Sequence, residues 1–344
     1  MDFLSFFIIC VKVLLVFAGT LLAVLIMVYA ERRVSAFMQG RLGPNRVGPQ
    51  GLLQPIADGI KFLMKEDIIP DGVNKPIYLL APVIMLIPAL MTFAVIPFGS
   101  TITLFDRDII LQVADVNIGI LYILALTSIG VYGIVLAGWA SNSKYTLIGG
   151  LRSSAQLISY ELALGLSVVS IILMSGSLRL NDIVADQQGY FLSWYVFKQP
   201  LAFLIFLIAT YAETNRLPFD LAEAEQELVG GYHTEYSSMK FAMFFMSEYA
   251  NMITAAALTV TLFFGGWDVP LLDEKSLGIW GAMLSVASFI LKMGFFLFLF
   301  IWIRWTFPRF RYDQLMKLGW KVLLPLSLIN IFITGGYLTL AALK

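Results

Sequence analysis

The sequence predicts an all-α integral membrane protein with eight transmembrane helices and one further amphipathic helix at the membrane interface. Hydrophobic residues make up 59% of the 344-residue chain and charged residues only 13%, whereas a soluble domain carries about 25% charged residues. Apolar runs of about 20 residues, the length needed to cross a hydrocarbon core of ~30 Å, recur along the whole chain. Residues 1–344 are therefore expected to form a single polytopic membrane domain.

The apolar runs predict the positions of the spans. They cover about 3–30, 77–98, 116–140, 155–175, 199–214, 239–264, 278–303 and 321–343. The first run is much longer than the roughly 7–15 residues of a signal-peptide core, and no small-residue cleavage site follows it, so it counts as a span. At 1.5 Å per residue this helix is about 42 Å long, and it must tilt, bend or protrude from the bilayer.

The basic residues predict how these spans are oriented. If the N-terminus lies outside, the inner segments are 31–76, 141–154, 215–238 and 304–320, and with their flanking residues they hold 16 of the 23 Lys and Arg residues. The outer segments hold only five. Because basic loops stay on the cytoplasmic side, both termini are expected on the outer side of the membrane.

The first inner segment contains the pattern of an interfacial helix. Residues 51–66 place six apolar side chains on one helical stripe, with Asp58, Lys61 and Lys65 elsewhere on the surface. The stripe consists of Leu52, Leu53, Ile56, Ile60, Leu63 and Met64. A helix with this pattern lies in the plane of the membrane surface, with its apolar face towards lipid.

The sequence holds too few soft ligands for a redox centre. Cys10 is the only cysteine and His233 the only histidine, whereas an iron–sulfur cluster is normally held by four cysteines and structural zinc by four Cys or His ligands. We therefore expect no metal site, cluster or haem in this chain, and any electrons must be carried by partner subunits. Lys and Arg balance Asp and Glu at 23 each, which argues against a nucleic-acid partner.

Four charged residues lie away from the inner ends of the predicted spans, and a charge near the bilayer centre costs at least ~2.5–3.5 kcal/mol. Lys12 is close enough to the outer end of its span to reach the interface. Glu161 and Glu248 are either structural hydrogen-bond partners or groups that bind and release protons because burial disfavours their charged form. Lys292 is either a structural counter-ion or a movable charge facing these acids.

Residues 213–240 depart from the basic pattern of the other inner segments. This segment carries Glu213, Asp220, Glu223, Glu225, Glu227 and Glu235 against Arg216 and Lys240. It could be a solvated acidic loop, but its acids alternate with apolar residues, so it is expected to fold against the rest of the protein. Since neighbouring carboxylates repel one another, some hold protons at neutral pH, which favours proton transfer over a metal site. His233 is expected to be a local hydrogen-bonding partner.

Four long motifs resemble the H subunit of respiratory complex I, which is called subunit 1 in mitochondria. They occupy residues 30–67, 138–161, 212–252 and 302–321, and they include the segments AERRVSAFMQGRLGPNR and AETNRLPFDLAEAEQELVGG. The resemblance implies eight spans, with the N-terminus opposite the hydrophilic arm. It also implies a membrane subunit of a proton-pumping NADH:quinone oxidoreductase that forms much of the quinone-binding cavity and the start of the proton route.

The same resemblance implies the site residues and the partners. The matching quinone-site positions are Glu31, Arg32, Phe37, Gln39, Arg41, Asp58, Arg216 and Phe219. The matching proton-transfer positions are Glu161, Glu213, Glu223, Glu225, Glu227 and Glu248. Lys292 is added to the proton-transfer residues because it lies in a span. Quinone is then the substrate, and FMN and iron–sulfur clusters reside in partner subunits. The implied partners are the hydrophilic subunits of the quinone site and the terminal cluster, small membrane subunits and the lipid bilayer.

Three other functions are compatible with the sequence. One is the anchor subunit of a related membrane-bound hydrogenase or formate hydrogenlyase, another is a subunit of a ferredoxin-linked relative, and the third is a stand-alone ion carrier. Arg32, Arg33, Arg41 and Asp58 together in the first inner segment favour quinone, and the lack of an evident internal repeat disfavours a carrier. Both ubiquinone and menaquinone fit. A bacterial inner membrane, with periplasmic termini, is preferred over an organelle because the chain is somewhat long for the mitochondrial type.

Overall fold

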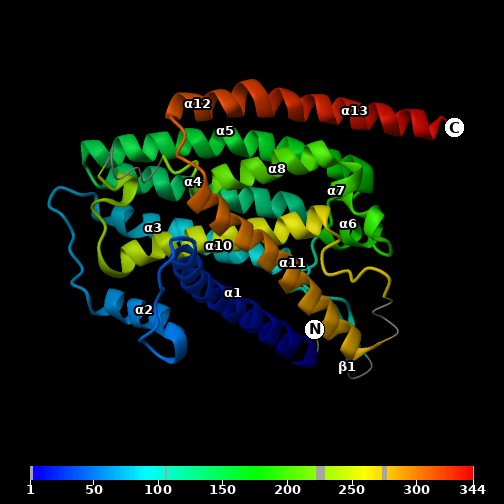
Figure 1. Cartoon of the computed structure of the whole chain (residues 1–344), viewed down its shortest axis with the longest axis horizontal. Coiled ribbons are helices and arrows are strands. Elements are labelled where there is room, and N and C mark those ends of the chain that lie inside the picture. The colour runs from blue at the N-terminus through cyan, green and yellow to red at the C-terminus, as the bar shows by residue number, and fades with distance from the viewer. Residues whose placement is uncertain (1–2, 105–106, 222–228, 273–276, 344) are drawn as a thin grey trace.

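The computed structural model describes residues 3–104, 107–221, 229–272 and 277–343. Its long helices are α1 (Phe3–Met38), α3 (Lys75–Met91), α4 (Gly119–Ala140), α5 (Lys144–Ser175), α10 (Ser238–Phe263), α11 (Ile279–Thr306) and α13 (Leu324–Ala342). The shorter helices are α2 (Gln54–Met64), α6 (Leu180–Asp186), α7 (Tyr195–Lys198), α8 (Pro200–Glu213) and α12 (Tyr312–Lys317). Single 3₁₀ turns cover Pro49–Gly51, Thr92–Val95, Phe191–Ser193 and Gly231–His233, and a π-helical turn (Leu318–Leu323) joins α12 to α13. In Figure 1, α4, α5, α8 and α13 run side by side, and α1 and α11 cross the bundle obliquely.

Seven of the described helical segments are long and apolar enough to cross a membrane, which confirms a helical multi-pass membrane fold. The fifth predicted span, 199–214, corresponds to α8, which has only 14 residues. At 1.5 Å per residue α8 is about 21 Å long, shorter than a hydrocarbon core of ~30 Å. One face of α8 is nevertheless packed inside the bundle, since Ala202, Ile205 and Phe206 are at most 1% exposed.

Two helices extend further than the apolar runs predict. α1 continues past residue 30 to Met38, and α5 begins at Lys144 rather than 155, so most of the predicted loop 141–154 is helical. The added turns are polar, and packing rather than hydropathy determines them. A Cβ atom added to Gly138 of α4 would lie 2.6 Å from the carbonyl oxygen of Thr146, so glycine is what allows the first turns of α5 to approach α4 closely.

The prediction of an all-α chain needs one correction. Strands β1 (Ile102–Leu104) and β2 (Arg107–Ile109) form an antiparallel hairpin between α3 and α4, with Ile102 opposite Ile109 and Thr103 opposite Asp108. Strands of three residues are too short to produce a detectable alternation in the sequence. The hairpin lies at the same end of the bundle as the N-terminus (Figure 1).

The predicted amphipathic helix is present as α2. All six residues of its apolar stripe are exposed, from 48% for Leu53 to 82% for Met64. Pro55 lies in the first turn of the helix, where backbone N–H groups have no intrahelical partner. The N–H group that proline lacks therefore costs no intrahelical hydrogen bond. Its exposed apolar face is what a helix lying against lipid requires.

Helix α10 forms the centre of the bundle. Every residue from Met252 to Phe263 is buried, and a helix that is buried on all sides has to be apolar or internally satisfied on all sides. Ala255, Ala256 and Ala257 keep its surface small, so that neighbouring helices approach closely. The three threonines of this stretch are buried, and Thr259 and Thr261 each donate to the carbonyl four residues earlier.

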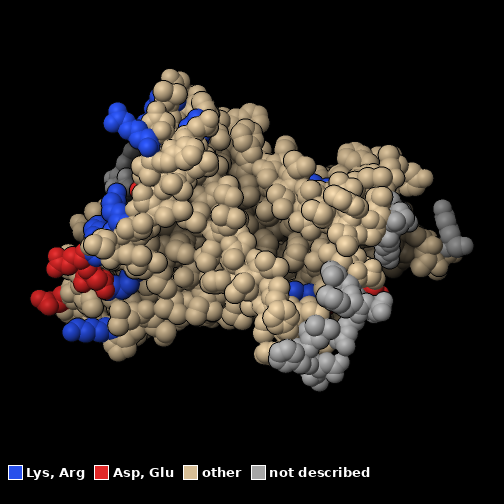
Figure 2. Space-filling view, turned by 90° about the horizontal axis from the view of Figure 1, so that it is seen from below, with Lys and Arg blue, Asp and Glu red and all other residues tan. Residues whose placement is uncertain are grey.

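Charged side chains gather at one end of the molecule. Figure 2 shows them at the end that carries α2, whereas the middle of the visible face is almost free of charge. The N- and C-terminal ends of the chain both lie towards the opposite end (Figure 1). The structure therefore brings the predicted inner segments together at the charged end.

Candidate functional site

A buried carboxylate near the inner end of α1 is the centre of a polar cluster. Glu31 is only 7% exposed. Arg216, which follows α8, donates from Nη1 to both carboxylate oxygens at 3.1 and 3.0 Å. The hydroxyl of Tyr249 on α10 donates to the same carboxylate at 2.7 Å, and Arg304 on α11 forms a further ion pair with it. Four segments that are distant in the sequence thus meet at Glu31.

Arg216 keeps its positive charge in this environment. Burial by itself would lower the pKa of its guanidinium, but the charge of Glu31, together with Tyr249 and Glu248, raises that pKa above its ordinary value. The guanidinium also lies over the ring of Tyr249, 4.2 Å from the centroid, an arrangement that stabilises a desolvated cation. A fixed cation therefore faces the interior at this end of the bundle.

The cluster borders a cavity of about 480 Å³. Its lining residues are Glu31, Arg32, Ser35, Arg216, Phe245, Glu248, Tyr249, Arg304 and Trp305. Guanidinium and phenol groups provide hydrogen-bond donors, and Phe245 and Trp305 provide apolar wall. We call this space the arginine cavity. Its chemistry suits a flat polar ligand with acceptor atoms.

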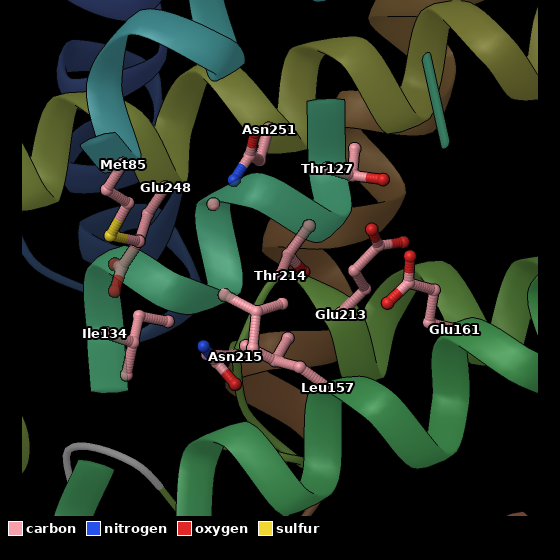
Figure 3. Close-up of a pocket in the computed structure, with 12 residues that line it drawn as sticks. Met85, Thr127, Ile134, Leu157, Glu161, Glu213, Thr214, Asn215, Glu248 and Asn251 are labelled. Atoms are coloured by element: carbon pink, nitrogen blue, oxygen red, sulfur yellow. The ribbon is translucent and has the colours of Figure 1, made fainter. Parts of the chain in front are cut away.

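A second, narrow pocket lies deeper in the bundle and is rich in carboxyl and amide groups. It is lined by Met85, Thr127, Gly130, Val131, Ile134, Leu157, Glu161, Glu213, Thr214, Asn215, Glu248 and Asn251. Figure 3 shows the carboxyl groups of Glu161 and Glu213 pointing towards each other, from α5 and α8. Ser128 on α4 donates to Glu161, and Thr127 hydrogen-bonds Glu213. We call this space the acid pocket.

Glu248 belongs to the lining of both spaces. It lies on α10 directly before Tyr249, is 5% exposed, and accepts a hydrogen bond of 3.1 Å from the hydroxyl of Tyr232. In Figure 3 it approaches the acid pocket from the side opposite Glu161. One carboxyl group therefore stands between the cluster around Glu31 and the pair Glu161–Glu213.

The segment after α8 is held in place by the side chains of Gln156 and Arg309. The amide of Gln156 on α5 donates to the carbonyls of Ala212 and Phe219 at 2.8 and 2.9 Å. Arg309 donates to Asp220 at 3.0 Å. Because these contacts bracket Arg216, they determine where its guanidinium lies relative to Glu31.

Comparison with known proteins identifies the family. The NADH dehydrogenase family profile matches residues 11–335. H subunit 1 of the NADH-quinone oxidoreductase of Geobacter sulfurreducens is 58% identical over 335 residues, which is 94% of this chain and 93% of that protein. The chain belongs to the H-subunit family of NADH-quinone oxidoreductases. H subunit 2 of Geobacter metallireducens is also 58% identical over 335 residues, which is 94% of this chain and 93% of that protein. H subunit 2 of Koribacter versatilis is 54% identical over 342 residues, which is 96% of each chain.

Three of the quinone-site positions implied by the resemblance meet in the arginine cavity of this complex I chain: Glu31, Arg32 and Arg216. Asp58 reaches its rim indirectly, through an ion pair with Arg32 that joins α2 to α1. The contact gives the interfacial helix a defined position beside the cavity.

The other implied quinone-site positions lie apart from the cavity lining. Phe37 is 60% exposed, and Arg41 donates to the side chain of Gln39 at 2.8 Å on the exposed end beyond α1. Phe219 is buried and stacks on Phe310 with the ring centroids 5.5 Å apart. In this chain Phe219 packs the segment after α8, whereas Phe37, Gln39 and Arg41 present a surface at the charged end.

Glu161, Glu213 and Glu248 share the acid pocket, but Lys292 does not line it. The ammonium group of Lys292 donates to the carbonyls of Phe264, Gly266 and Asp268 at 2.9, 3.1 and 2.7 Å, beyond the C-terminus of α10. It also lies 4.6 Å from the ring centroid of Trp194. These contacts place the ammonium group beyond the C-terminus of α10, where a cation is favourable. Glu223, Glu225 and Glu227 lie outside the described residues.

Sequence reasoning missed the partners of the charged groups. Tyr249 and Arg304 bind Glu31, and Thr127, Ser128 and Asn251 surround the acid pocket. Tyr249 follows Glu248 directly, but a single tyrosine in an apolar span does not by itself indicate a functional site. Within the part of the chain that the structure describes, no group of three His, Cys, Asp or Glu side chains could hold a metal ion.

Proposed function

We propose that this chain forms the membrane side of the quinone site of an NADH:quinone oxidoreductase and the first part of its proton route. The observation that carries the proposal is the position of Glu248, which lines both the arginine cavity and the acid pocket. A group shared by two such spaces can transmit a change of charge in one to the protonation of the other. The relatives' names supply the substrates, NADH and a quinone.

The arginine cavity offers what a quinone head group needs. A quinone has two carbonyl oxygens that accept hydrogen bonds, and the guanidinium groups of Arg216 and Arg304 supply donors at the cavity wall. Reduction adds negative charge to these oxygens, and fixed guanidinium groups in a site shielded from water stabilise developing negative charge. An apolar tail would leave towards the bilayer between α1 and α2.

The acid pocket continues the path into the membrane. When a reduced head group attracts Arg216, the pairing of Arg216 with Glu31 weakens, and the nearby Glu248 experiences less positive charge. Glu248 then favours its protonated form, and the proton can pass to Glu213 and Glu161, whose carboxyls face each other (Figure 3). Hydroxyl and amide groups of Thr127, Ser128 and Asn251 provide hydrogen-bonding steps between the acids.

The chain performs this work without a redox group of its own. FMN and the iron–sulfur clusters belong to partner subunits, which also supply the hydrophilic half of the quinone site at the charged end of the bundle. Small membrane subunits are the other partners. The relatives' names favour this function over the hydrogenase anchor and the ion carrier.

We further propose eight spans, with α8 as a short fifth span and both termini on the periplasmic side of a bacterial inner membrane. Burial of α8 between α5 and α10 supports its inclusion, because the neighbours can adapt to a helix shorter than the bilayer. The gathering of the inner segments at one end of the bundle supports the orientation (Figure 2).

The quinone site can be tested with Arg216→Ala in the assembled complex. Quinone reduction should fall by about tenfold or more, because a charge-stabilising donor is lost, while NADH oxidation by a water-soluble acceptor continues. Arg179→Ala is the matched control, since it also removes an arginine that is paired with a carboxylate, Asp115, but neither residue lines the cavity or contacts the segment that carries Arg216. If both activities fall equally in fully assembled Arg216→Ala complex, the quinone-site assignment is wrong.

A further inference from the structure

A third cavity lies at the end of the bundle opposite the arginine cavity. It is larger than either space described above and is open on one side. Helices α5, α7, α8 and α13 enclose it through Met174, Lys198, Gln199, Pro200, Leu201, Asn330, Ile333, Thr334 and Tyr337. The functions proposed above make no use of this space.

A layer of buried polar side chains forms one wall of this cavity. Gln199, Asn330 and Thr334 are at most 8% exposed. Asn330 donates to the Gln199 side chain at 3.1 Å, and Gln199 donates to the Thr334 hydroxyl at 2.9 Å. The layer connects the start of α8 to α13. Since its members are hydrogen-bonded to one another, it tolerates contact with an apolar ligand.

The shortness of α8 creates the space. α8 begins at Pro200 and is about 21 Å long, which leaves roughly 9 Å of hydrocarbon thickness that the helix does not cover. α13 continues for eight residues beyond Thr334, or about 12 Å. Figure 1 shows this end of α13 projecting past α7. Ile333 and Tyr337, 62% and 65% exposed, thus border a region at membrane depth that protein does not fill.

A cation stands at the mouth of the cavity. Lys198 ends α7, is exposed, and lies 5.2 Å from the ring centroid of Tyr195. None of the ion pairs between described residues involves Lys198. Its charge is therefore available to an anion, and a lysine at the rim of an interhelical cavity is well placed for a lipid phosphate.

We propose that this cavity binds a phospholipid with an anionic headgroup. The phosphate lies at Lys198, and one acyl chain runs along Met174, Leu201 and Ile333. A small water-soluble anion would leave the apolar wall uncovered, and an uncharged hydrocarbon would not use Lys198. The bound lipid completes the hydrocarbon thickness beside the short helix α8 and holds the end of α13 against α5 and α7.

The test uses the intact complex in nanodiscs that contain phosphatidylglycerol with a photoreactive group on one acyl chain. After irradiation, mass spectrometry should find the label on peptides covering 170–201 and 326–340. Unlabelled phosphatidylglycerol should compete about fivefold more strongly than phosphatidylcholine. Labelling no stronger than on the exposed face of α1 would show that lipid at this site is only bulk bilayer, and would overturn the proposal.

Variants separate the two parts of the site. Lys198→Gln should lower labelling by phosphatidylglycerol about fivefold, to the level of a phosphatidylcholine probe, whereas Lys198→Arg should retain it. Ile333→Trp should lower labelling by both probes, because it fills the space for the acyl chain. Lys321→Gln is the matched control, because it removes the same charge from the π-helical turn before α13, outside the cavity lining. Equal labelling of Lys198→Gln and the unsubstituted complex would refute the headgroup assignment.

Discussion

At the scale of single residues, the ion cluster around Glu31 shows how a membrane protein retains charge in its interior. A buried carboxylate is stable only when its oxygens are paired. Arg216, Arg304 and Tyr249 supply those partners from three different segments. A change at one partner is therefore felt by the other two, which is the behaviour that a site for a ligand of changing charge requires.

Tyr249→Phe removes one donor from this cluster and should lower the stability of the assembled protein by about 1.5–3 kcal/mol, since the lost bond is to a charged acceptor. Tyr211→Phe is the matched control. Tyr211 is 3% exposed and stacks on Phe300, but its hydroxyl has no hydrogen-bond partner among the described residues. Its removal should be neutral or slightly stabilising. Thermal inactivation midpoints of the two purified complexes provide the comparison, and equal losses would contradict the prediction.

Lys292 provides a second residue-scale prediction. Because its ammonium group binds three carbonyls beyond α10, Lys292→Gln should lower thermal stability while the number of protons translocated per quinone reduced stays the same. Lys292→Arg, which keeps the positive charge, should lower thermal stability less than Lys292→Gln does. The number of protons translocated per quinone reduced is measured as proton uptake into vesicles together with quinone reduction. A lower ratio in the stable Lys292→Arg complex would instead place this residue in the proton route.

At the scale of elements, glycine determines how closely the helices approach. A Cβ atom on Gly149 of α5 would lie 2.9 Å from the backbone of Gly231, which itself has a positive φ of 65°. This contact seats the turn Gly231–His233 against α5, and Tyr232 from that turn donates to Glu248. Backbone spacing at α5 therefore influences a side chain of the proposed proton route.

Gly149→Ala should destabilise the protein by about 1–3 kcal/mol, because backbone atoms have to move to accept the methyl group. Gly165→Ala, on the same helix, meets no atom within 4 Å and should be neutral or stabilising by up to about 1 kcal/mol through helix propensity. The thermal midpoints of both assembled variants measure the difference. If Gly149→Ala is as stable as Gly165→Ala, the two segments are not in the close contact described here.

At the scale of the whole molecule, the arrangement of two connected spaces leads to a prediction about pumping. Glu213→Gln and Glu161→Gln keep volume and hydrogen-bonding capacity but remove the exchangeable proton. Each should abolish most quinone-linked turnover and proton uptake, because the acid pocket then lacks one of its two facing carboxyls (Figure 3). Complexes confirmed to be fully assembled are compared in vesicles. Wild-type pumping by both variants would leave these acids with a structural role only.

Hydropathy and charge were enough to predict most of the architecture. Seven of the eight predicted spans are long apolar helices, and the amphipathic segment 51–66 contains α2. The polar first turns of α5 and the short hairpin β1–β2 were not predicted, because neither has an apolar or alternating pattern of sufficient length in the sequence. The bounds of the fifth predicted span, 199–214, agree with those of α8 within one residue at each end.

The sequence by itself determined that this chain is a membrane protein, which ends of its helices carry the basic loops, and that Glu161 and Glu248 are ionisable residues within spans, while the family resemblance indicated Glu31, Glu213 and Arg216. Only the tertiary structure decided their partners. Glu31 and Arg216 are 185 positions apart, and Arg304 lies 273 positions from Glu31. Contacts across such separations depend on how several helices pack together, and a local pattern of residues carries no record of that packing.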